Sequence, residues 1–283
     1  MTIARPDQSP YQDLYIYYLK GRVPVDAMAD AAAYIGNWEE EEDSFLFFTR
    51  SADQLVARVV EQYSHLTLSD RFQMTYDDWQ GGALSPMRIG ELEVVPAWHH
   101  SADSPEDESL LLDPGVVFGA GTHPTTRDCL EAIQMAFARH SMTDVVDLGT
   151  GTGLLALAAV KLGARRCVAV DLNRLAVETA MRNVRLNGMT DRIVVAQGDA
   201  KNFIDLSCDL MVSNIHYDVM RQIVAAPGFK AMKQFVISGL LRSQADRIER
   251  QLLHLGARIL QKWEWDGIWF TFHGENVTYG FKR

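Results

Sequence analysis

Seven consecutive residues, Asp147-Leu148-Gly149-Thr150-Gly151-Thr152-Gly153, combine closely spaced glycines with hydroxyl side chains directly after an apolar run. Glycine adopts positive φ without strain and lets a ligand approach the backbone closely. Glycines placed between a strand and a helix in this way are typical of nucleotide sites in doubly wound sheets. Asp171 follows about twenty residues later, where a carboxylate can accept both hydroxyls of a ribose. Together these features indicate a site for an adenosine-containing ligand.

The G-x-G-x-G spacing argues against two common phosphate sites. A dinucleotide fingerprint has its third glycine one residue further on, and a P-loop continues with Gly-Lys-Ser/Thr. Each feature also has a structural explanation, since a glycine-rich turn can simply end a strand and Asp171 can cap the next helix. It is the pair of features that favours adenosine.

A second polar cluster, "FGAGTHPTTRDCL", runs from Phe118 to Leu130. It places glycines, a histidine and three threonines at what looks like the start of a helix. Pro124 suits the first helical position, because its fixed φ matches the helix and its missing N–H is not needed there. This stretch offers exposed backbone and hydroxyl groups to a ligand.

Size and composition limit which proteins can carry these clusters. With 283 residues, 47% of them apolar, the chain suits one large and one smaller domain. A net charge of −10 argues against direct nucleic-acid binding. We find neither an apolar run of about eighteen residues nor a signal peptide, which predicts a cytoplasmic protein without a membrane partner. The three separated cysteines, Cys129, Cys167 and Cys208, are predicted to be core thiols, and no metal site is expected.

The first part of the chain alternates short elements. Strands are predicted over 14–19, 44–48 and 71–76, and helices over 25–35 and from Ser51, where Ser51 and Gln54 match a capping box. This alternation is typical of a small α/β sandwich. The Gly81-Gly82 pair and two short strand candidates around Gly90 indicate a connector.

From about Asp144 the pattern changes to longer strand–helix repeats. The predicted strands cover 144–149, 166–171, 192–199, 208–215 and 234–239, and the predicted helices 154–163, 175–188, 217–225 and 243–255. Continuous apolar strands indicate a sheet covered on both faces, which is mostly parallel. Asp266-Gly267 predicts a hairpin, so that the last strand runs antiparallel to its neighbour at the far side of the sheet. The predicted fold class is α/β, a Rossmann-like sheet with an antiparallel C-terminal hairpin plus a small N-terminal α/β domain.

These stretches carry a resemblance to a known family. "DLGTGTG" with "VAVDLN" is similar to motif I and the acidic loop of class I S-adenosylmethionine methyltransferases. "LLDPGVVFGAGTHPTT" resembles the signature of the bacterial ribosomal protein L11 methyltransferase family, known as PrmA. The resemblance extends from roughly Arg71 to His273, and it implies a ferredoxin-like recruiting domain and a Rossmann-like catalytic domain. We predict a substrate-recruiting domain over 1–76, a connector over 77–113 and the methyltransferase domain over 114–283.

The resemblance assigns one group of contacts to the methionine end of S-adenosylmethionine. Phe118 and His123 would close over it, and Thr126, in the first turn of its helix, would form a hydrogen bond near the sulfonium. The free N–H groups after Pro124 would point toward the cofactor carboxylate. His123 has an alternative role as a helix cap without ligand contact.

The remaining cofactor contacts follow the strands. Gly149 and Gly151 would face the methionine portion, Asp171 the ribose and Asp199 the adenine amino group. Asn214, at the end of the fourth strand, completes the set implied by the resemblance.

The chain departs from the family after Asn214, where it reads Ile215-His216-Tyr217-Asp218 instead of the usual Ile-Leu. Asn-x-x-Tyr also resembles the Asn-Pro-Pro-Tyr motif of glutamine and adenine amino-methyltransferases, without the two prolines. A lysine acceptor must lose a proton before it attacks, because its reference pKa is about 10.4. His216 could accept this proton or simply fill space, and His216 and Asn214 are the catalytic candidates.

Three functions fit the sequence. The leading one is methyl transfer from S-adenosylmethionine to lysine or N-terminal amines of a protein substrate, ribosomal protein L11. The second keeps the cofactor but uses another protein or a small molecule as acceptor, and the third is a non-catalytic S-adenosylmethionine-binding module. Because a sulfonium is already an activated methyl donor, in-line alignment in a dry pocket supplies most of the rate. The sequence predicts no oligomeric state.

Overall fold

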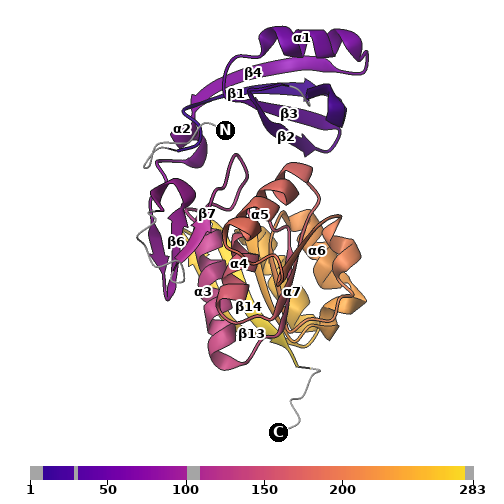
Figure 1. Cartoon of the computed structure of the whole chain (residues 1–283). Helices are drawn as coiled ribbons and strands as arrows, with labels where there is room; N and C mark the ends of the chain where they lie inside the picture. Colours follow the sequence, from indigo (N-terminus) through magenta and orange to yellow (C-terminus); the bar gives the residue numbers. More distant parts are fainter. Residues whose placement is uncertain (1–8, 29–30, 101–108, 278–283) are drawn as a thin grey trace. The chain divides into compact units, whose positions relative to one another are not determined.

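The computed structural model describes residues 9–28, 31–100 and 109–277. The chain divides into two compact units, which we describe separately. The first contains the chain up to Ser85 and two short later segments, and the second contains the rest of the chain from Pro86 onward. Figure 1 shows the elements of both units along the sequence. No helix in the described ranges combines the length and the apolar character that a membrane crossing requires.

Within the described residues, four antiparallel strands and two α-helices build the first unit (Figure 1). The strands are β1 (Asp13–Lys20), β2 (Tyr34–Glu40), β3 (Asp43–Phe48) and β4 (Thr67–Thr75), in the order β2-β3-β1-β4. Helix α1 (Asp53–Gln62) buries Val56 and Val59 against a core that includes Leu46 and Phe48. This strand order, with a helix between β3 and β4, is that of the ferredoxin-like βαββαβ motif. In the described residues, the position of the first helix of the motif is taken by the 3-10 turn η1 (Val25–Met28).

The helix predicted over 25–35 is therefore wrong. Only η1 is helical, residues 29–30 lie outside the described part, and Tyr34 already begins β2. The alanines of this segment favour a helix, but pairing of β2 with β3, where Gly36 lies opposite Phe47, overrides that weak preference.

The capping box predicted at Ser51 is also wrong, although the helix itself is present. Helix α1 begins at Asp53 with Ala52 as its N-cap and no side-chain cap. The Ser51 hydroxyl donates to the Asp53 carboxylate at 2.7 Å instead. A short α2 (Tyr76–Gln80), which the sequence did not predict, follows β4 and ends at Gly81 in the left-handed conformation.

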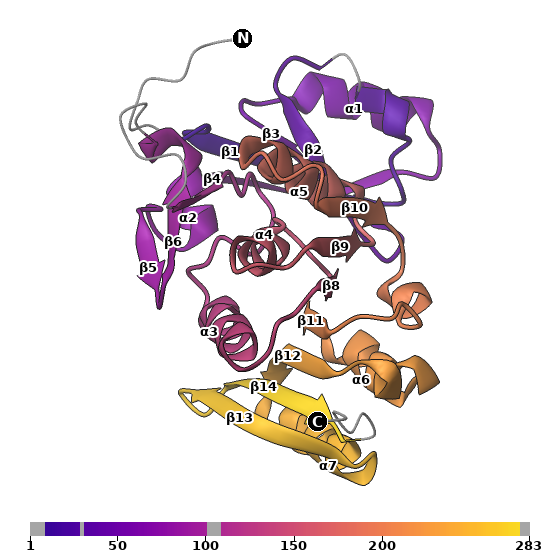
Figure 2. The same cartoon turned by 60° about the horizontal axis from the view of Figure 1, so that its bottom comes forward.

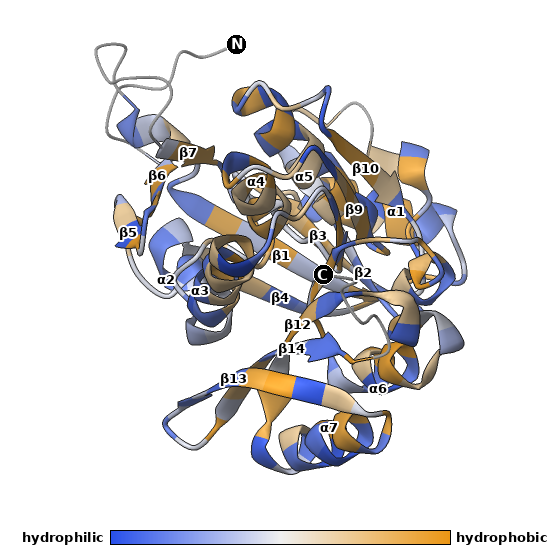
Figure 3. Cartoon of the chain, turned by 90° about the horizontal axis from the view of Figure 1, so that it is seen from below, coloured by the Kyte–Doolittle hydropathy of each residue, from blue (hydrophilic) through white to orange (hydrophobic). Residues whose placement is uncertain are grey.

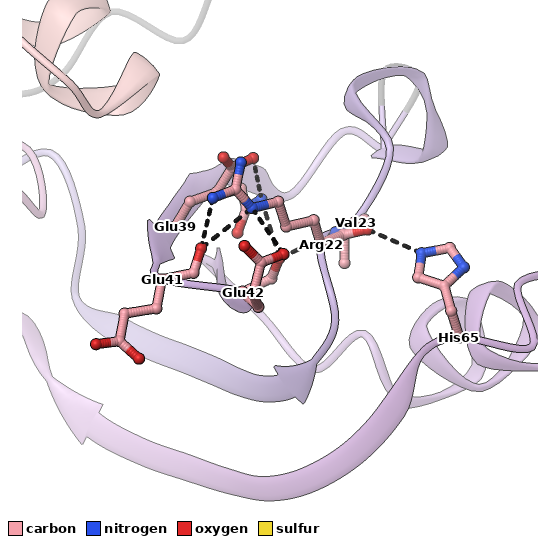
Figure 4. A network of polar contacts seen from close by, with 8 residues as sticks. Arg22, Val23, Glu39, Glu41, Glu42 and His65 are labelled. Atoms are coloured by element: carbon pink, nitrogen blue, oxygen red, sulfur yellow. Dashed lines mark hydrogen bonds and ion pairs between the residues drawn. The ribbon is translucent and has the colours of Figure 1, made fainter. Parts of the chain in front are cut away.

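The acidic run from Glu39 to Asp43 forms the β2–β3 hairpin (Figure 4). Arg22, just after β1, donates from Nε and Nη2 to the Glu41 carbonyl at 3.1 and 2.6 Å. Its Nε also lies 3.6 Å from the Glu42 carboxylate, and His65 Nε2 contacts the Arg22 carbonyl at 3.1 Å. The Arg22 and Glu42 side chains are largely exposed, so this ion pair contributes less than about 1 kcal/mol.

A seven-stranded sheet forms the centre of the second unit (Figure 2). Its strands are β8 (Asp144–Leu148), β9 (Arg166–Asp171), β10 (Ile193–Gln197), β11 (Leu210–Asn214), β12 (Gln234–Leu241), β13 (Ala257–Trp265) and β14 (Trp269–Asn276). The order is β10-β9-β8-β11-β12-β14-β13, and the first five strands in it are parallel. The Rossmann-like, mostly parallel sheet predicted from the sequence is confirmed.

The C-terminal hairpin turns at Asp266 and Gly267, which both have positive φ, 49° and 65°. The Ile268 N–H donates to the Trp265 carbonyl at 2.9 Å, as expected for a tight turn. Strand β14 runs antiparallel to both β12 and β13. The antiparallel prediction is confirmed, but β14 lies between the other two strands, and β13 forms the sheet edge.

Helices cover both faces of this sheet (Figure 2). They are α3 (Pro124–Arg139), α4 (Leu154–Lys161), α5 (Arg174–Leu186), α6 (Tyr217–Ala225) and α7 (Arg242–His254). One apolar cluster joins the sheet to α3, α4 and α5, and a second joins it to α6 and α7. Figure 3 shows hydrophilic residues alternating with hydrophobic ones along α7, whereas α4 is buried from Leu154 to Val160.

A small third sheet belongs to the same unit. It consists of β5 (Met87–Ile89), β6 (Leu92–Pro96) and β7 (Ser109–Leu112), in that order. The two strands predicted around Gly90 are confirmed as β5 and β6. Ile89, Leu92 and Leu110 lie in the same apolar cluster as α3 and α4.

Candidate active site

The glycine loop lies between β8 and α4, and all three glycines have positive φ: 78° at Gly149, 55° at Gly151 and 85° at Gly153. Backbone N–H groups of Gly149 and Thr150 donate to the Val170 carbonyl at 2.8 and 2.9 Å. A Cβ on Gly151 would lie 2.7 Å from the Phe118 carbonyl, and one on Gly149 would overlap Ile215 Cγ2. The glycines therefore let three chain segments meet at the end of β8.

Asp171 ends β9 and faces this loop. Its Oδ2 accepts the Gly151 N–H at 2.9 Å, and its carbonyl accepts the Gly198 N–H at 2.9 Å. Asn173, not Asp171, accepts the Leu175 N–H at the start of α5, at 3.1 Å. The carboxylate of Asp171 is thus held at the carboxyl end of the sheet, where it faces the glycine loop.

Asp199 follows the neighbouring strand β10. Its Oδ1 accepts the Lys201 N–H at 3.0 Å, and its Oδ2 lies 3.0 Å from Lys201 Nζ. Gln197 of β10 pairs with Asp171 of β9, so that Asp199 follows at the same edge of the sheet. Leu172, the residue after Asp171, leaves 70% of its surface exposed. An exposed apolar side chain therefore follows Asp171 directly in the sequence.

The motif also contains a buried carboxylate, Asp147, on β8. The Thr150 hydroxyl donates to its Oδ2 at 2.7 Å, while its Oδ1 is buried and has no hydrogen-bond partner in the described part of the chain. Desolvation and, to a smaller extent, the charge of Asp171 raise the pKa of Asp147 to about 7, against the lowering effect of the Thr150 hydrogen bond. Thr126 Oγ1 on α3 is likewise buried without a partner in that part. Asp147 Oδ1 and Thr126 Oγ1 are thus two buried polar atoms of the site whose hydrogen-bonding capacity the described residues do not use.

Replacing Asp147 by asparagine is expected to change how stability depends on pH. Between the ordinary carboxyl pKa of about 4 and the raised value of about 7, the folded wild type holds a proton that the unfolded chain has lost. Its free energy of unfolding should therefore fall as pH rises through this window, by at most about 1.4 kcal/mol per pH unit. Asp147→Asn should remove that fall, as urea titrations at pH 5, 6.5 and 8 would measure. Identical pH profiles for both proteins would refute the shift, and exposed Asp191→Asn is the charge-matched control.

The helix α3 begins directly at the site. His123 is its N-cap and Pro124 its first residue, and His123 Nδ1 accepts the Thr125 N–H at 3.3 Å. The same Nδ1 lies 2.7 Å from the Thr125 hydroxyl. Burial lowers the pKa of His123, which favours the neutral form of the ring. The capping role that the sequence left open for His123 is therefore present.

Two aromatic rings flank His123. Phe118 lies 5.4 Å from it and Trp269 lies 5.1 Å from it, centroid to centroid, both edge to face. Phe118 leaves 53% of its surface exposed, and Trp269 begins β14. The segment that contains Phe118 is fixed by the Thr152 hydroxyl, which donates to the Gly119 carbonyl at 2.8 Å. The signature segment is thus joined to the glycine loop.

Asn214 ends β11 and reaches the start of α3. Its Nδ2 donates to Thr125 Oγ1 at 3.1 Å, and a Cβ on Gly239 would lie 2.9 Å from its Oδ1. His216, the other catalytic candidate, caps α6 by accepting the Asp218 N–H at 3.4 Å. Its side chain is 74% exposed, and a hydrogen bond to Asn214 does not occur in the described part. The structure connects Asn214, and not His216, to the predicted site.

The structure places the eight predicted cofactor residues at the carboxyl ends of parallel strands or on the segments that meet there. They are Phe118, His123, Thr126, Gly149, Gly151, Asp171, Asp199 and Asn214. Open α/β sheets bind ligands at this edge, where the strand order reverses, here between β8 and β11. The described ranges contain no group of three or more histidine, cysteine, aspartate or glutamate side chains that could hold a metal ion.

Several supporting residues were not predicted. Buried Asn183 on α5 donates to the carbonyls of Asp113 and Thr152, at 3.0 and 2.9 Å, and accepts the Asp113 N–H at 2.9 Å. Asn187 makes the same exchange with the backbone of Leu111, at 2.9 and 2.7 Å. An asparagine inside an amphipathic helix was the available signal, since the amide is a poor helix former that can instead bind backbone groups.

The model of the family described as "Ribosomal protein L11 methyltransferase (PrmA)" matches residues 12–276 of this chain. The chain belongs to this family. The resemblance inferred from the glycine loop and the signature segment is confirmed, and the protein is a methyltransferase of the PrmA family.

Individual members of the PrmA family match over most of the chain. A ribosomal protein L11 methyltransferase of Desulfitobacterium hafniense is 34% identical over 259 residues, which are 89% of this chain and 80% of the relative. The corresponding protein of Streptococcus equi subsp. zooepidemicus is 31% identical over 253 residues, 86% of this chain and 78% of the relative. The crystal structure of a ribosomal protein L11 methylase from Lactobacillus delbrueckii subsp. bulgaricus is 28% identical, with a TM-score of 0.58. The match covers 68% of this chain and 99% of the chain in that crystal structure.

Proposed function

We propose that this protein transfers a methyl group from S-adenosylmethionine to an amino nitrogen of ribosomal protein L11, a lysine side chain or an N-terminal amine. The names of the relatives support the protein substrate. The observation that carries the proposal is the junction of the signature segment with the glycine loop and Asn214, made by Thr152 and Thr125. With a ribosomal protein as substrate, the reaction belongs in the cytoplasm.

The residues present fit S-adenosylmethionine. Asp171 offers a carboxylate for ribose hydroxyls, and exposed Leu172 offers an apolar surface for adenine. Among the described residues, buried Asp147 Oδ1 and Thr126 Oγ1 have no hydrogen-bond partner, and the charged amino-acid end of the cofactor carries both donors and acceptors. We propose that Phe118, His123, Gly149, Gly151, Asp199 and Asn214 complete this site.

When bound, the cofactor supplies an electrophilic methyl group. The acceptor nitrogen would accept this methyl group, sulfur would keep the electron pair of the carbon–sulfur bond, and the methylated nitrogen would release a proton to water. The task of the protein is to align nitrogen, carbon and sulfur and to exclude water, because such alignment supplies most of the rate. Apolar groups around the site, Phe118, Trp269 and Ile215, would limit its hydration.

Transfer of labelled methyl groups tests this function. The purified protein, labelled S-adenosylmethionine and purified L11 should give labelled L11, and mass spectrometry should place the methyl groups on amino nitrogens. Label on another protein or on a small molecule of a lysate from a deletion strain, with L11 unlabelled, would favour the alternative acceptor. Cofactor binding without any transfer would instead favour a binding module.

Asp171→Ala is expected to weaken S-adenosylmethionine binding by about 1 to 3 kcal/mol, because the ribose hydroxyls lose charge-assisted hydrogen bonds. The variant also removes the acceptor for the Gly151 N–H, so circular dichroism should accompany calorimetry. Asp191→Ala, at an exposed position, is the control. Unchanged affinity in Asp171→Ala would exclude Asp171 from the site.

A further inference from the structure

The hydrogen bonds around Thr125 have only one consistent set of directions. His123 Nδ1 accepts the Thr125 backbone N–H at 3.3 Å, and a backbone N–H can only donate. Nδ1 therefore carries a lone pair and no proton. At the 2.7 Å contact between Nδ1 and Thr125 Oγ1, the hydroxyl must be the donor.

This direction determines the orientation of the Asn214 amide. A threonine hydroxyl has a single proton, and His123 already receives it. At the 3.1 Å contact with Asn214, Thr125 Oγ1 can therefore only accept, and the amide must present Nδ2 to it. Oδ1 then lies on the opposite side of the amide, against Gly239, where a Cβ would approach it to 2.9 Å. The orientation follows from chemistry and does not depend on telling amide oxygen from nitrogen.

Neighbouring groups keep this arrangement in place. Thr125 is 1% exposed, so its side chain is held within the core at the start of α3. In the described part of the chain, Oδ1 of Asn214 accepts no hydrogen bond, so it remains available as an acceptor at the carboxyl end of β11.

We propose that His123 and Thr125 are positioning residues, which orient Asn214 so that its carbonyl oxygen, and not its amide nitrogen, faces the amine to be methylated. This inference rests on the proposed function. An oxygen accepts an N–H of a neutral amine and leaves the nitrogen lone pair free to attack the methyl carbon. An amide N–H in its place would donate to that lone pair and block the attack.

A matched pair of variants tests the proposal. Thr125→Val keeps the shape of the buried side chain but removes the hydroxyl, and Thr125→Ser keeps the hydroxyl. Thr125→Val should lower kcat toward L11 about 10- to 100-fold, because a misplaced acceptor loses its alignment. The dissociation constant of S-adenosylmethionine should change less than about threefold, a difference under 1 kcal/mol. Thr125→Ser should restore most of kcat. Equal kcat in the two variants would overturn the proposal, as would a loss confined to cofactor affinity.

A measurement that needs no activity provides an independent test. Nitrogen-15 NMR of the uniformly labelled full-length protein, with His123→Gln to assign the signal, should show the His123 proton on Nε2 at neutral pH. A proton on Nδ1 would reverse both hydrogen bonds and overturn the proposal. If the wild type carried the Nε2 proton but did not methylate L11, the proposed function would be contradicted. If the wild type were active and the two Thr125 variants had equal kcat, only the positioning role would be contradicted.

Discussion

Replacing Gly149 by valine is expected to abolish S-adenosylmethionine binding while the protein remains folded. Gly149 has a φ of 78°, and a Cβ there would overlap Ile215 Cγ2. The branched side chain would therefore displace Ile215 and occupy space between the ends of β8 and β11, where we place the methionine portion. A loss of about 3 kcal/mol or more, over a hundredfold in affinity, is expected in calorimetry.

Backbone strain must be separated from this effect, because valine at positive φ costs about 1–2 kcal/mol by itself. Gly163 is the matched control: its φ is 115°, and a Cβ there meets no atom within 4 Å. Gly163→Val should lose a similar amount of stability and bind the cofactor normally. If Gly149→Val also bound normally, the glycine loop would be only a turn between β8 and α4.

The second unit could be predicted closely from the sequence because its elements follow simple patterns. Apolar runs such as 144–149 and 208–215 contain the buried strands β8 and β11, and glycines at 163 and 188 follow the ends of helices α4 and α5. The hairpin followed from Asp266-Gly267, whose residues adopt the positive φ that a tight turn requires. What the pattern did not reveal was that β14 inserts between β12 and β13, since strand order depends on pairing between distant segments.

The first unit was harder to predict. Its β2 strand contains Tyr34 and Gly36 next to an alanine-rich stretch, so local preference favoured a helix. Only pairing with β3 determines its structure. Short elements depend more on such tertiary pairing than long periodic ones do.

The site residues show the same difference between local motifs, which the sequence reveals, and long-range contacts, which it does not. Gly149, Gly151 and Asp171 belong to a local motif, and the sequence indicated them directly. Thr125 acts on Asn214, which lies 89 positions away, and Asn183 holds Asp113, 70 positions away. No spacing rule links such partners, so the residues that orient and support the site became visible only in the fold.

A fragment that begins at Pro86 is expected to bind S-adenosylmethionine like the whole chain and to lose most of its activity toward L11. All cofactor contacts that we propose lie beyond Pro86, and the fragment keeps β5, β6 and β7, whose apolar side chains belong to the core of the second unit. We propose that the ferredoxin-like unit recruits the protein substrate. Its removal would lower the effective concentration of the acceptor, which typically contributes about 10²- to 10⁴-fold. Calorimetry and methyl transfer to L11, with fragment and whole chain side by side, measure the two effects.

A short lysine peptide provides the matched control, because a substrate too small to reach a recruiting surface gains nothing from one. Whole chain and fragment should methylate this peptide at similar rates, while only the whole chain should methylate L11 efficiently. Adding the separate first unit in trans should not restore the activity toward L11, since recruitment works through the covalent connection. Full methylation of L11 by the fragment would show that the first unit is not the recruiter. Loss of cofactor binding by a folded fragment would show that residues before Pro86 contribute to the cofactor site.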